Sequence, residues 1–196
     1  MTHIENIPHI LKYGITHISS PNRNHNYKPI GDGGLIGTRN DFLMPNGKRL
    51  GEYIPFYFGV RMPMLYVIQK GFNGVKIIKP ENIVYCFTSV KRIIKHNLEY
   101  IFTDGHAIDS LTDFYYPENI NEIETLIDKK AINSKYWKDD TDLDLKRRKE
   151  AEFLVKEDIP ISAIKGFVVY NDNAKDILQK NKISDNAIYV LPQCYF

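Results

Sequence analysis

Cysteine and tryptophan are scarce in this chain of 196 residues, which contains 2 cysteines and 1 tryptophan. The two cysteines, Cys86 and Cys194, lie far apart and provide neither a disulfide framework nor a cluster of metal ligands. The 6 histidines lack an accompanying pattern of acidic ligands. We therefore expect a cytosolic protein with no structural zinc and no catalytic metal.

Long apolar runs are absent as well, and the mean hydropathy is -0.35. A membrane-spanning helix needs roughly 20 consecutive apolar residues, so we expect no membrane partner. The sequence does not open with a basic stretch followed by an apolar run, so we expect no secretory signal and a soluble, cytoplasmic protein.

Charge of one sign is not in excess either, since the formal net charge is +2 and the pI is about 8.4. Proteins that bind nucleic acid strongly and without sequence preference usually carry a clearer basic excess. The charge therefore permits a nucleic-acid partner without requiring one.

The chain does contain enough apolar sequence for one well-buried core, with 43% hydrophobic and 26% charged residues. No repeat, linker or low-complexity segment divides it, so we expect a single domain over residues 1–196. Helical and strand patterns alternate, which predicts a mixed α/β (α+β) fold. The expected helices cover residues 5–13, 63–68, 90–94, 120–128 and 174–180, and the expected strands cover 53–58, 83–88, 98–102, 152–155, 166–170 and 187–191.

Two segments lack these patterns. Residues 19–52 are rich in proline, glycine and polar side chains, which predicts one long loop before the strand at residue 53. Loops of this length inside compact domains are usually functional lids or disordered, and a substrate-covering role is one interpretation. Residues 133–149 are polar and charged and are expected on the surface.

The stretch Tyr53–Ile68, YIPFYFGVRMPMLYVI, places Arg61 between an aromatic strand and a helix that begins near Pro63. A guanidinium beside the free N–H groups of a helix start favours phosphate or another anion, and aromatic rings offer flat surfaces to a base or a nicotinamide ring. The alternative is a core-filling strand followed by an arginine that faces water. The residues alone favour that alternative.

A second candidate is Glu152, which stands at the head of the apolar run Phe153–Val155. A carboxylate there is either part-buried and functional or an exposed strand end, and the residues alone favour the exposed strand end. Glu150 lies close by and is expected to face the opposite side of an extended chain.

Four segments of the chain together resemble one known family, in the same order along the sequence. They are THIENIPHILKYGI (residues 2–15), YIPFYFGVRMPMLYVI (53–68), FTDGHAIDSLTDFY (102–115) and RRKEAEFLV (147–155). No segment is specific enough alone, but the series resembles the DarT family of DNA ADP-ribosyltransferase toxins. This resemblance implies an ADP-ribosyltransferase-like fold, whose central, split and mostly antiparallel sheet is flanked by helices.

The resemblance also implies site residues. The glutamate of AEFLV is the catalytic one in this family, which makes Glu152 the catalytic carboxylate here, and Arg61 falls in the pocket as a catalytic or NAD-contacting residue. NAD is the implied cosubstrate, and its contacts are expected at Thr2, His3, Ile4, Arg61 and Tyr57.

This chain departs from the family pattern at two places. Family members begin several residues earlier, so we expect Met1 to shorten the first strand and weaken NAD binding. Val60 and Met62 stand where many relatives have proline and serine, which alters the expected preference of the pocket.

The acceptor implied by the resemblance is a base in single-stranded DNA, often thymidine and in one branch guanosine. Such bases bind by stacking on aromatic rings and through cations that follow the backbone. The expected DNA contacts lie mainly in the segment that leads to Glu152, at His106, Tyr115, Tyr116, Trp137, Arg147 and Arg148. A solvated charged loop, whose aromatics anchor it to the core, explains the same residues equally well.

The resemblance therefore predicts a toxin that moves ADP-ribose from NAD to a DNA base and releases nicotinamide. It also implies a macrodomain antitoxin (DarG-like) that reverses the modification. Two other functions stay open: a transferase of the same fold that acts on RNA or protein, and a non-catalytic module that binds nucleotides or nucleic acid.

Overall fold

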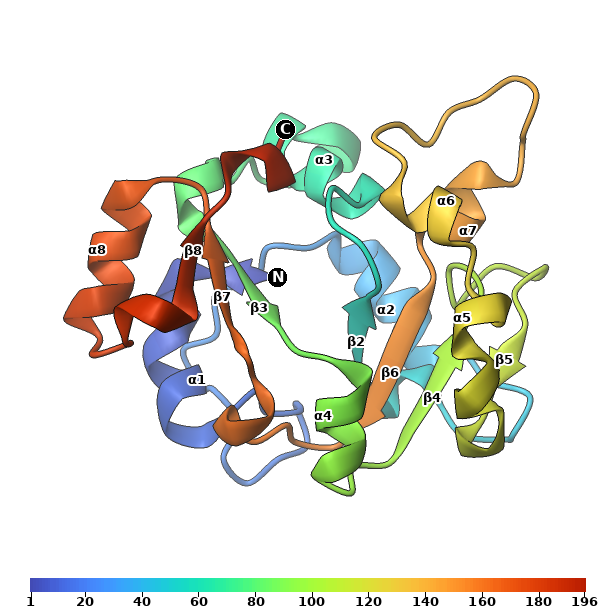
Figure 1. The fold of residues 1–196 in the computed structure, drawn as a ribbon, viewed down its shortest axis with the longest axis horizontal. Helices are drawn as coiled ribbons and strands as arrows, with labels where there is room; N and C mark the ends of the chain where they lie inside the picture. The colour runs from blue at the N-terminus through green and yellow to red at the C-terminus, as the bar shows by residue number, and fades with distance from the viewer. The chain divides into compact units, whose positions relative to one another are not determined.

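Two sheets organise the chain, and each is contained in one of two compact units (Figure 1). The computed structural model describes residues 1–196. The first unit comprises residues 1–32, 67–98 and 157–196, and the second comprises residues 33–66 and 99–156. Both sheets are wholly or mostly antiparallel and are accompanied by helices, so the predicted fold class is confirmed. The single domain stays a prediction.

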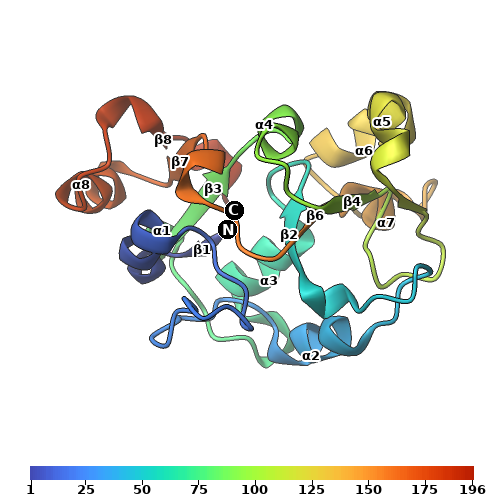
Figure 2. The same ribbon diagram turned by 90° about the horizontal axis from the view of Figure 1, so that it is seen from below.

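The sheet of the first unit has 4 strands in the order β1-β3-β7-β8. The first three pair antiparallel, whereas β7 and β8 pair parallel. A parallel pair needs a crossover, and α8 (Asp172–Lys180) provides it; both views show this helix beside β7 and β8 (Figure 2). The strands are β1 (Thr2–His3), β3 (Ile83–Phe87), β7 (Gly166–Val169) and β8 (Ile188–Val190).

The predicted first helix is confirmed as a 3-10 turn, η1 (Ile4–Asn6), followed by α1 (Ile7–Tyr13). It ends at Gly14, whose φ of +84° favours glycine and where an added Cβ would lie 2.1 Å from the carbonyl oxygen of Ile159. The unit also contains α4 (Val90–Lys95) and the 3-10 turns η3 (Phe72–Gly74), η4 (Pro80–Asn82), η6 (Ile161–Ala163), η7 (Asp185–Ala187) and η8 (Pro192–Cys194).

The sheet of the second unit has 4 strands in the order β2-β6-β4-β5, all antiparallel. They are β2 (Tyr53–Tyr57), β6 (Glu152–Lys156), β4 (Tyr100–Thr103) and β5 (Phe114–Tyr115). Paired residues point to the same face of a sheet, and successive residues point to opposite faces. Tyr57 pairs with Glu152, so both side chains lie on one face of the sheet. Phe102 pairs with Phe153 and with Tyr115, so these three side chains lie on the other face.

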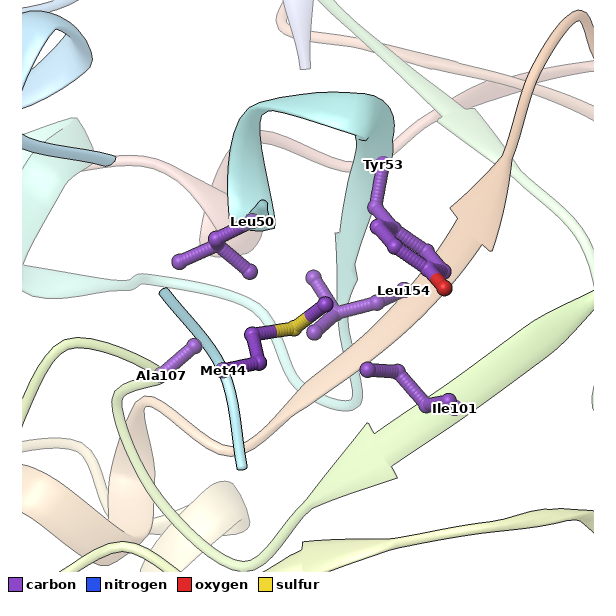
Figure 3. Close-up of a cluster of buried hydrophobic side chains, with 6 residues drawn as sticks. All are labelled: Met44, Leu50, Tyr53, Ile101, Ala107 and Leu154. Carbon is purple, nitrogen blue, oxygen red and sulfur yellow. The ribbon is translucent and has the colours of Figure 1, made fainter. Parts of the chain in front are cut away.

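A cluster of buried side chains covers the Glu152 face of this sheet (Figure 3). Its members come from three strands, from a 3-10 turn and from loops: Met44, Leu50, Tyr53, Ile101, Ala107 and Leu154. Figure 3 shows Met44 reaching across toward Leu154 of β6. The segment that contains Met44 and Leu50 is thereby packed onto the sheet.

That segment corrects the predicted loop over residues 19–52, because it contains α2 (Gly33–Asp41) and η2 (Leu50–Glu52). No residue of α2 is buried, so the sequence GGLIGTRND shows no apolar stripe from which a helix could be predicted. The helix is held instead by distant contacts: Arg39 pairs with Glu152, and Asn40 packs against Gly51.

The remaining helices of the second unit are short. They are η5 (Pro117–Glu122), α5 (Ile123–Leu126), α6 (Lys129–Asn133) and α7 (Leu145–Lys149), together with the start of α3 (Pro63–Lys70). The prediction of a surface segment over residues 133–149 is wrong at its end, because Lys149 is completely buried. No helix of the chain has both the length and the apolar composition that a membrane crossing requires.

Candidate active site

Glu152 is the first residue of β6, and none of its surface is exposed to solvent. Its Oε1 accepts hydrogen bonds from Arg39 Nη1 at 2.8 Å and from the Ala107 N–H at 3.0 Å. Its Oε2 accepts from Arg39 Nη2 at 2.7 Å. A buried carboxylate is stable only when it is paired and hydrogen-bonded, and both conditions are met here. The exposed strand end favoured by the residues alone is therefore wrong.

Arg39 is the residue that sequence reasoning missed. It lies on α2, 113 positions from Glu152, and its side chain is 13% exposed. Burial alone would lower its pKa, but the charge and hydrogen bonds of Glu152 outweigh this effect and raise the pKa. A single sequence does not show that two residues so far apart pair with each other. The sequence shows only that Arg39 lies in the segment that precedes the aromatic strand.

A short loop after β4 supplies the third group around Glu152. Thr103 Oγ1 accepts a hydrogen bond from the Glu152 N–H at 3.1 Å and donates to the Gly105 carbonyl at 2.7 Å. Gly105 is required by its surroundings, since an added Cβ would lie 2.5 Å from Arg147 Nη1. This close packing fixes the loop so that the Ala107 N–H points at the carboxylate.

Glu150 is a second buried acidic residue, two positions before Glu152, and the extended backbone expected for it is wrong. It ends α7 instead of lying in an extended chain, and it is 7% exposed. Burial raises its pKa to about 7, and the negative charge of Glu152 contributes in the same direction, whereas Lys146 opposes it. The two carboxyls therefore interact electrostatically.

Two further titratable side chains interact with Glu152. Burial raises the pKa of Tyr57, and the charges of Glu152 and Glu150 raise it further. Burial lowers the pKa of the half-buried His106, although the charge of Glu152 opposes that shift. The structure thus brings the predicted Tyr57 and His106 into the electrostatic neighbourhood of the predicted catalytic glutamate.

Arg61 lies where the sequence predicted, between β2 and α3, with a left-handed φ of 56° that is uncommon for a residue other than glycine. The buried Lys149 clamps this turn by donating to the Val60 carbonyl at 3.4 Å and the Ser134 carbonyl at 2.6 Å. Burial lowers the pKa of Lys149, and the positive charge of Arg61 adds to that effect. The guanidinium that holds Glu152 is nevertheless that of Arg39.

The predicted DNA-contacting arginines take part in ion pairs within the second unit. Arg147 contacts Asp104 at 2.9 Å and Asp144 at 2.7 Å. Arg148 pairs with Asp128 and Asp142, and with Asp144 at 3.1 Å. These contacts tie α7 to the loop after β4, to the start of α6 and to the segment that directly precedes α7.

The predicted aromatic contacts are dispersed. Tyr115 stacks on Phe102 at 5.2 Å between ring centroids, on the sheet face opposite Glu152. Tyr116 packs against the buried cluster of Figure 3. Trp137 meets Tyr66 edge-on at 5.5 Å. The structure therefore does not gather these rings into one stacking surface with Glu152.

The predicted NAD segment of the first unit is strand β1, at the edge of its sheet, followed by η1. Thr2 and Ile4 are buried, and Thr2 Oγ1 accepts a hydrogen bond from the Asn6 side chain at 2.9 Å. His3 Nδ1 accepts from the Glu5 N–H at 3.2 Å. The structure contains no group of three or more His, Cys, Asp or Glu side chains that could hold a metal ion.

Comparisons with known proteins all identify the same family. Residues 1–196 match the family described as "ssDNA thymidine ADP-ribosyltransferase, DarT". A DNA ADP-ribosyl transferase of Escherichia coli O127:H6 is 32% identical over 178 residues, which cover 89% of this chain and 80% of that protein. A fusion of a DNA ADP-ribosyl transferase and a DNA ADP-ribosyl glycohydrolase from Thermosipho africanus is 29% identical over 100% of this chain and 48% of its own length.

Solved structures agree with the sequence relatives. DarT of Thermus sp. 2.9 in complex with ADP-ribosylated ssDNA has a TM-score of 0.82 and 29% identity, covering 100% of this chain and 93% of that one. Its complex with NAD+ has a TM-score of 0.77 and 28% identity, covering 100% and 94%. Because the family match covers the whole chain and the fold agrees, this chain belongs to the DarT family of ssDNA thymidine ADP-ribosyltransferases.

Proposed function

We propose that this protein transfers the ADP-ribosyl group of NAD to thymidine in single-stranded DNA and releases nicotinamide. The family match and the Thermus structures with NAD+ and with ADP-ribosylated ssDNA support this proposal. The observation that carries it is the state of Glu152: a fully buried carboxylate held by a bidentate arginine and a backbone N–H. An inactive binding module has no need of such a costly group.

Glu152 stabilises the reacting sugar. Nicotinamide leaves NAD without acid catalysis, because cleavage of the glycosidic bond neutralises the positive charge of its ring. The ribose becomes cation-like at the same time, and a nearby carboxylate stabilises that charge. Oε2 accepts only the bond from Arg39, so a lone pair is left for a ribose hydroxyl.

Arg39 is the positioning residue for this carboxylate. Its two parallel N–H bonds fix the plane of the Glu152 carboxylate, which a single-point contact would not do. Since Glu152 has no exposed surface, a covering group has to move before a substrate can reach it.

The remaining substrate contacts are assigned by unit. In the first unit Thr2, His3 and Ile4 contact NAD, mainly through their main chain, because Thr2 and Ile4 are buried. In the second unit Tyr57 and Arg61 serve NAD. His106 is the best-supported DNA contact, since it interacts with the charges of both Glu152 and Arg39. The ion pairs of Arg147 and Arg148 favour a role in holding α7 over direct contact with DNA.

The protein acts as the toxin of a toxin–antitoxin pair, and its partner is a macrodomain glycohydrolase that removes the modification. The Thermosipho africanus fusion of transferase and glycohydrolase supports this pairing. Growth of bacteria that express the chain tests it. Arrest that Glu152→Gln abolishes and that a co-expressed DNA ADP-ribosyl glycohydrolase relieves is expected, whereas equal toxicity of the Gln variant would reject the enzymatic basis.

The substrate class is tested with labelled NAD and separate pools of single-stranded DNA, RNA and protein. We expect label on DNA and, in oligonucleotides that differ in one base, only where thymidine is present. Label confined to guanosine would correct the base, and label confined to RNA or protein would reject DNA as the substrate.

A further inference from the structure

The connection between α1 and α2, residues 16–32, contains neither a helix nor a strand. Residues 21–23 and 25–29 are exposed, and such a segment is usually mobile because it has few buried contacts. Hydrogen bonds nevertheless attach it to the first unit at two places, which are Asn6 of η1 and Asp158 after β6. The larger attachment is the one at Asn6.

Asn6 is 1% exposed, and every hydrogen-bonding position of its amide is used. Its Oδ1 accepts from the Lys28 N–H at 2.9 Å and from the Asn24 side chain at 3.4 Å. Its Nδ2 donates to the Lys28 carbonyl and to Thr2 Oγ1, both at 2.9 Å. An amide has two N–H donors and two acceptor sites on its oxygen, so no further bond is open to a substrate. Asn6 therefore acts only through the groups that it holds.

Those groups belong to two segments of the first unit that are distant in the sequence. Thr2 lies in β1, whereas Lys28 lies in the connection, 22 positions from Asn6. Because one nitrogen of Asn6 contacts both Thr2 and Lys28, the segment Asn24–Lys28 lies directly beside β1. Tyr27, next to the anchored Lys28, is 54% exposed and offers an aromatic ring on this segment.

We propose that Asn6 is a positioning residue for NAD, which holds the segment Asn24–Lys28 beside β1 as one wall of the NAD site. The inference rests on the proposed function, in which Thr2, His3 and Ile4 contact NAD. Asn6 joins the first of these residues to the segment through its own amide. The dinucleotide therefore meets a strand and a segment that are already fixed relative to each other.

Asp158 holds the other end of the connection. Its Oδ1 accepts from the His17 N–H at 2.7 Å, and its Oδ2 accepts from the Ser20 hydroxyl at 2.6 Å. The Ser20 hydroxyl in turn accepts from the Asn22 N–H at 3.0 Å. Together with Asn6, this carboxylate gives the exposed residues a polar anchor on each side.

The proposal predicts an effect on NAD binding and not on the chemical step. If the segment is in place only part of the time, NAD binds to that fraction of the protein, and the apparent dissociation constant rises as the fraction falls. At saturating NAD the segment is in place in every complex, so kcat does not change. A residue that contributed only to global stability would leave the KM of the folded protein for NAD unchanged.

Asn6→Asp tests this in the full chain, because aspartate keeps the shape and the acceptor oxygen but cannot donate to Thr2 or to the Lys28 carbonyl. Transfer to a saturating thymidine oligonucleotide is measured across NAD concentrations. The KM for NAD should rise about tenfold, since two hydrogen bonds are lost, while kcat stays within about twofold. Asn22→Asp adds the same charge to an exposed side chain outside the segment and is the matched control, with a KM near that of the wild type.

Asp158→Asn is the second variant, and it decides the question if Asn6→Asp does not fold. It loosens the opposite end of the connection, because asparagine keeps one oxygen for the His17 N–H and loses the acceptor of the Ser20 hydroxyl. Since it leaves the bonds of Asn6 in place, the KM for NAD should rise less, by about threefold, again with little change in kcat.

Limited digestion with trypsin follows the segment without depending on transfer. Arg23 is exposed and directly precedes Asn24, whereas Lys28 is followed by proline, which prevents cleavage there. Cleavage after Arg23 should be faster in Asn6→Asp than in the wild type, and saturating NAD should slow it in both. Cleavage after the exposed Lys180, at the end of α8 in the same unit, should be equal in the two proteins.

Three outcomes would overturn the inference. They are a KM for NAD that equals the wild-type value in both Asn6→Asp and Asp158→Asn, a fall in kcat with an unchanged KM, and cleavage that accelerates equally after Arg23 and Lys180, which shows a general loss of stability. A wild-type protein that neither transfers ADP-ribose nor is protected by NAD would instead refute the proposed function itself, so the two failures are distinguishable.

Discussion

Two carboxyls, two positions apart, have opposite environments in this molecule. Glu152 receives two bonds from Arg39 and one from the Ala107 N–H, whereas Glu150, which is 7% exposed, lies in no ion pair. Burial of Glu150 outweighs the nearby positive charges of Lys146, Lys149 and Arg39, and it raises the pKa of this carboxyl to about 7. The carboxylate held by Arg39 and the Ala107 N–H is therefore the one to which we assign charge stabilisation.

The cost of burying Glu150 predicts a pH-dependent gain in stability for Glu150→Gln. Folding raises the pKa of Glu150 from 4.5 to about 7. Between pH 4.5 and pH 7, the folded protein therefore keeps a proton on this carboxyl that the unfolded chain releases. Stability contributed by the protonated acid is full below about pH 4.5 and is lost as pH rises through about 7. At about pH 8 the variant should be more stable by up to about 3 kcal/mol.

Urea unfolding of both proteins at acid and alkaline pH measures this effect. The advantage of Glu150→Gln should disappear near pH 4.5, and exposed Glu118→Gln should show no such dependence. A constant difference at all pH values would contradict the assignment of the raised pKa.

Replacing Arg39 is expected to lower the stability of the protein, and a second substitution at Glu152 is expected to recover most of that loss. Arg39→Met leaves Glu152 buried and charged without its partner, which should lower the free energy of unfolding by about 3–5 kcal/mol. The double variant Arg39→Met, Glu152→Leu removes both charges and should recover most of that loss. Additive losses in a double-mutant cycle would show that the pair is not coupled.

At the level of single residues, the family motif located Glu152 in the sequence. Its complete burial could not be predicted, because the residues that precede it are basic and indicate an exposed position. Arg39 could not be predicted at all, because its partner lies 113 positions away. Lys149 was assigned to the surface by its composition, although three carbonyl oxygens accept its bonds in the interior.

Among the elements, those with strong local patterns were predicted and those held by distant contacts were not. The aromatic and β-branched runs of β2, β3 and β7 and the Pro63 start of α3 are visible in the sequence. The helix α2 is not, since its glycines and lack of an apolar stripe argue against a helix. Its stability comes from the ion pair with β6 and from the buried cluster that follows it.

A small substitution in the loop after β4, at Gly105, is expected to disturb the site. Gly105→Ala would place a Cβ 2.5 Å from Arg147 Nη1 and 2.7 Å from its Cγ, so the loop or α7 has to shift. The Ala107 N–H would then move from Glu152, and we expect a loss of about 1–3 kcal/mol together with reduced transfer.

Gly37→Ala is the matched control, because nothing lies within 4 Å of its added Cβ and alanine favours the helix. This variant should be slightly more stable in thermal unfolding. If Gly105→Ala unfolds and transfers like wild type, the loop does not position the N–H group as described.

For the whole molecule, the sequence predicted the class of the fold but not its strand order. Each sheet joins strands that are distant in the sequence, such as β1 with β3 and β2 with β6. Such pairings depend on contacts that one sequence does not display. The resemblance to a family supplied what local patterns lack, and the match over residues 1–196 confirms it.

Mass spectrometry of a single-stranded oligonucleotide, incubated with NAD and this protein, reports the reaction and the modified base together. The family match predicts one ADP-ribose on thymidine with the wild-type chain, and the role of Glu152 predicts none with Glu152→Gln, whose thermal unfolding serves as the control for folding. Unmodified DNA with the wild type, or equal modification by the Gln variant, would contradict the role assigned to this carboxylate.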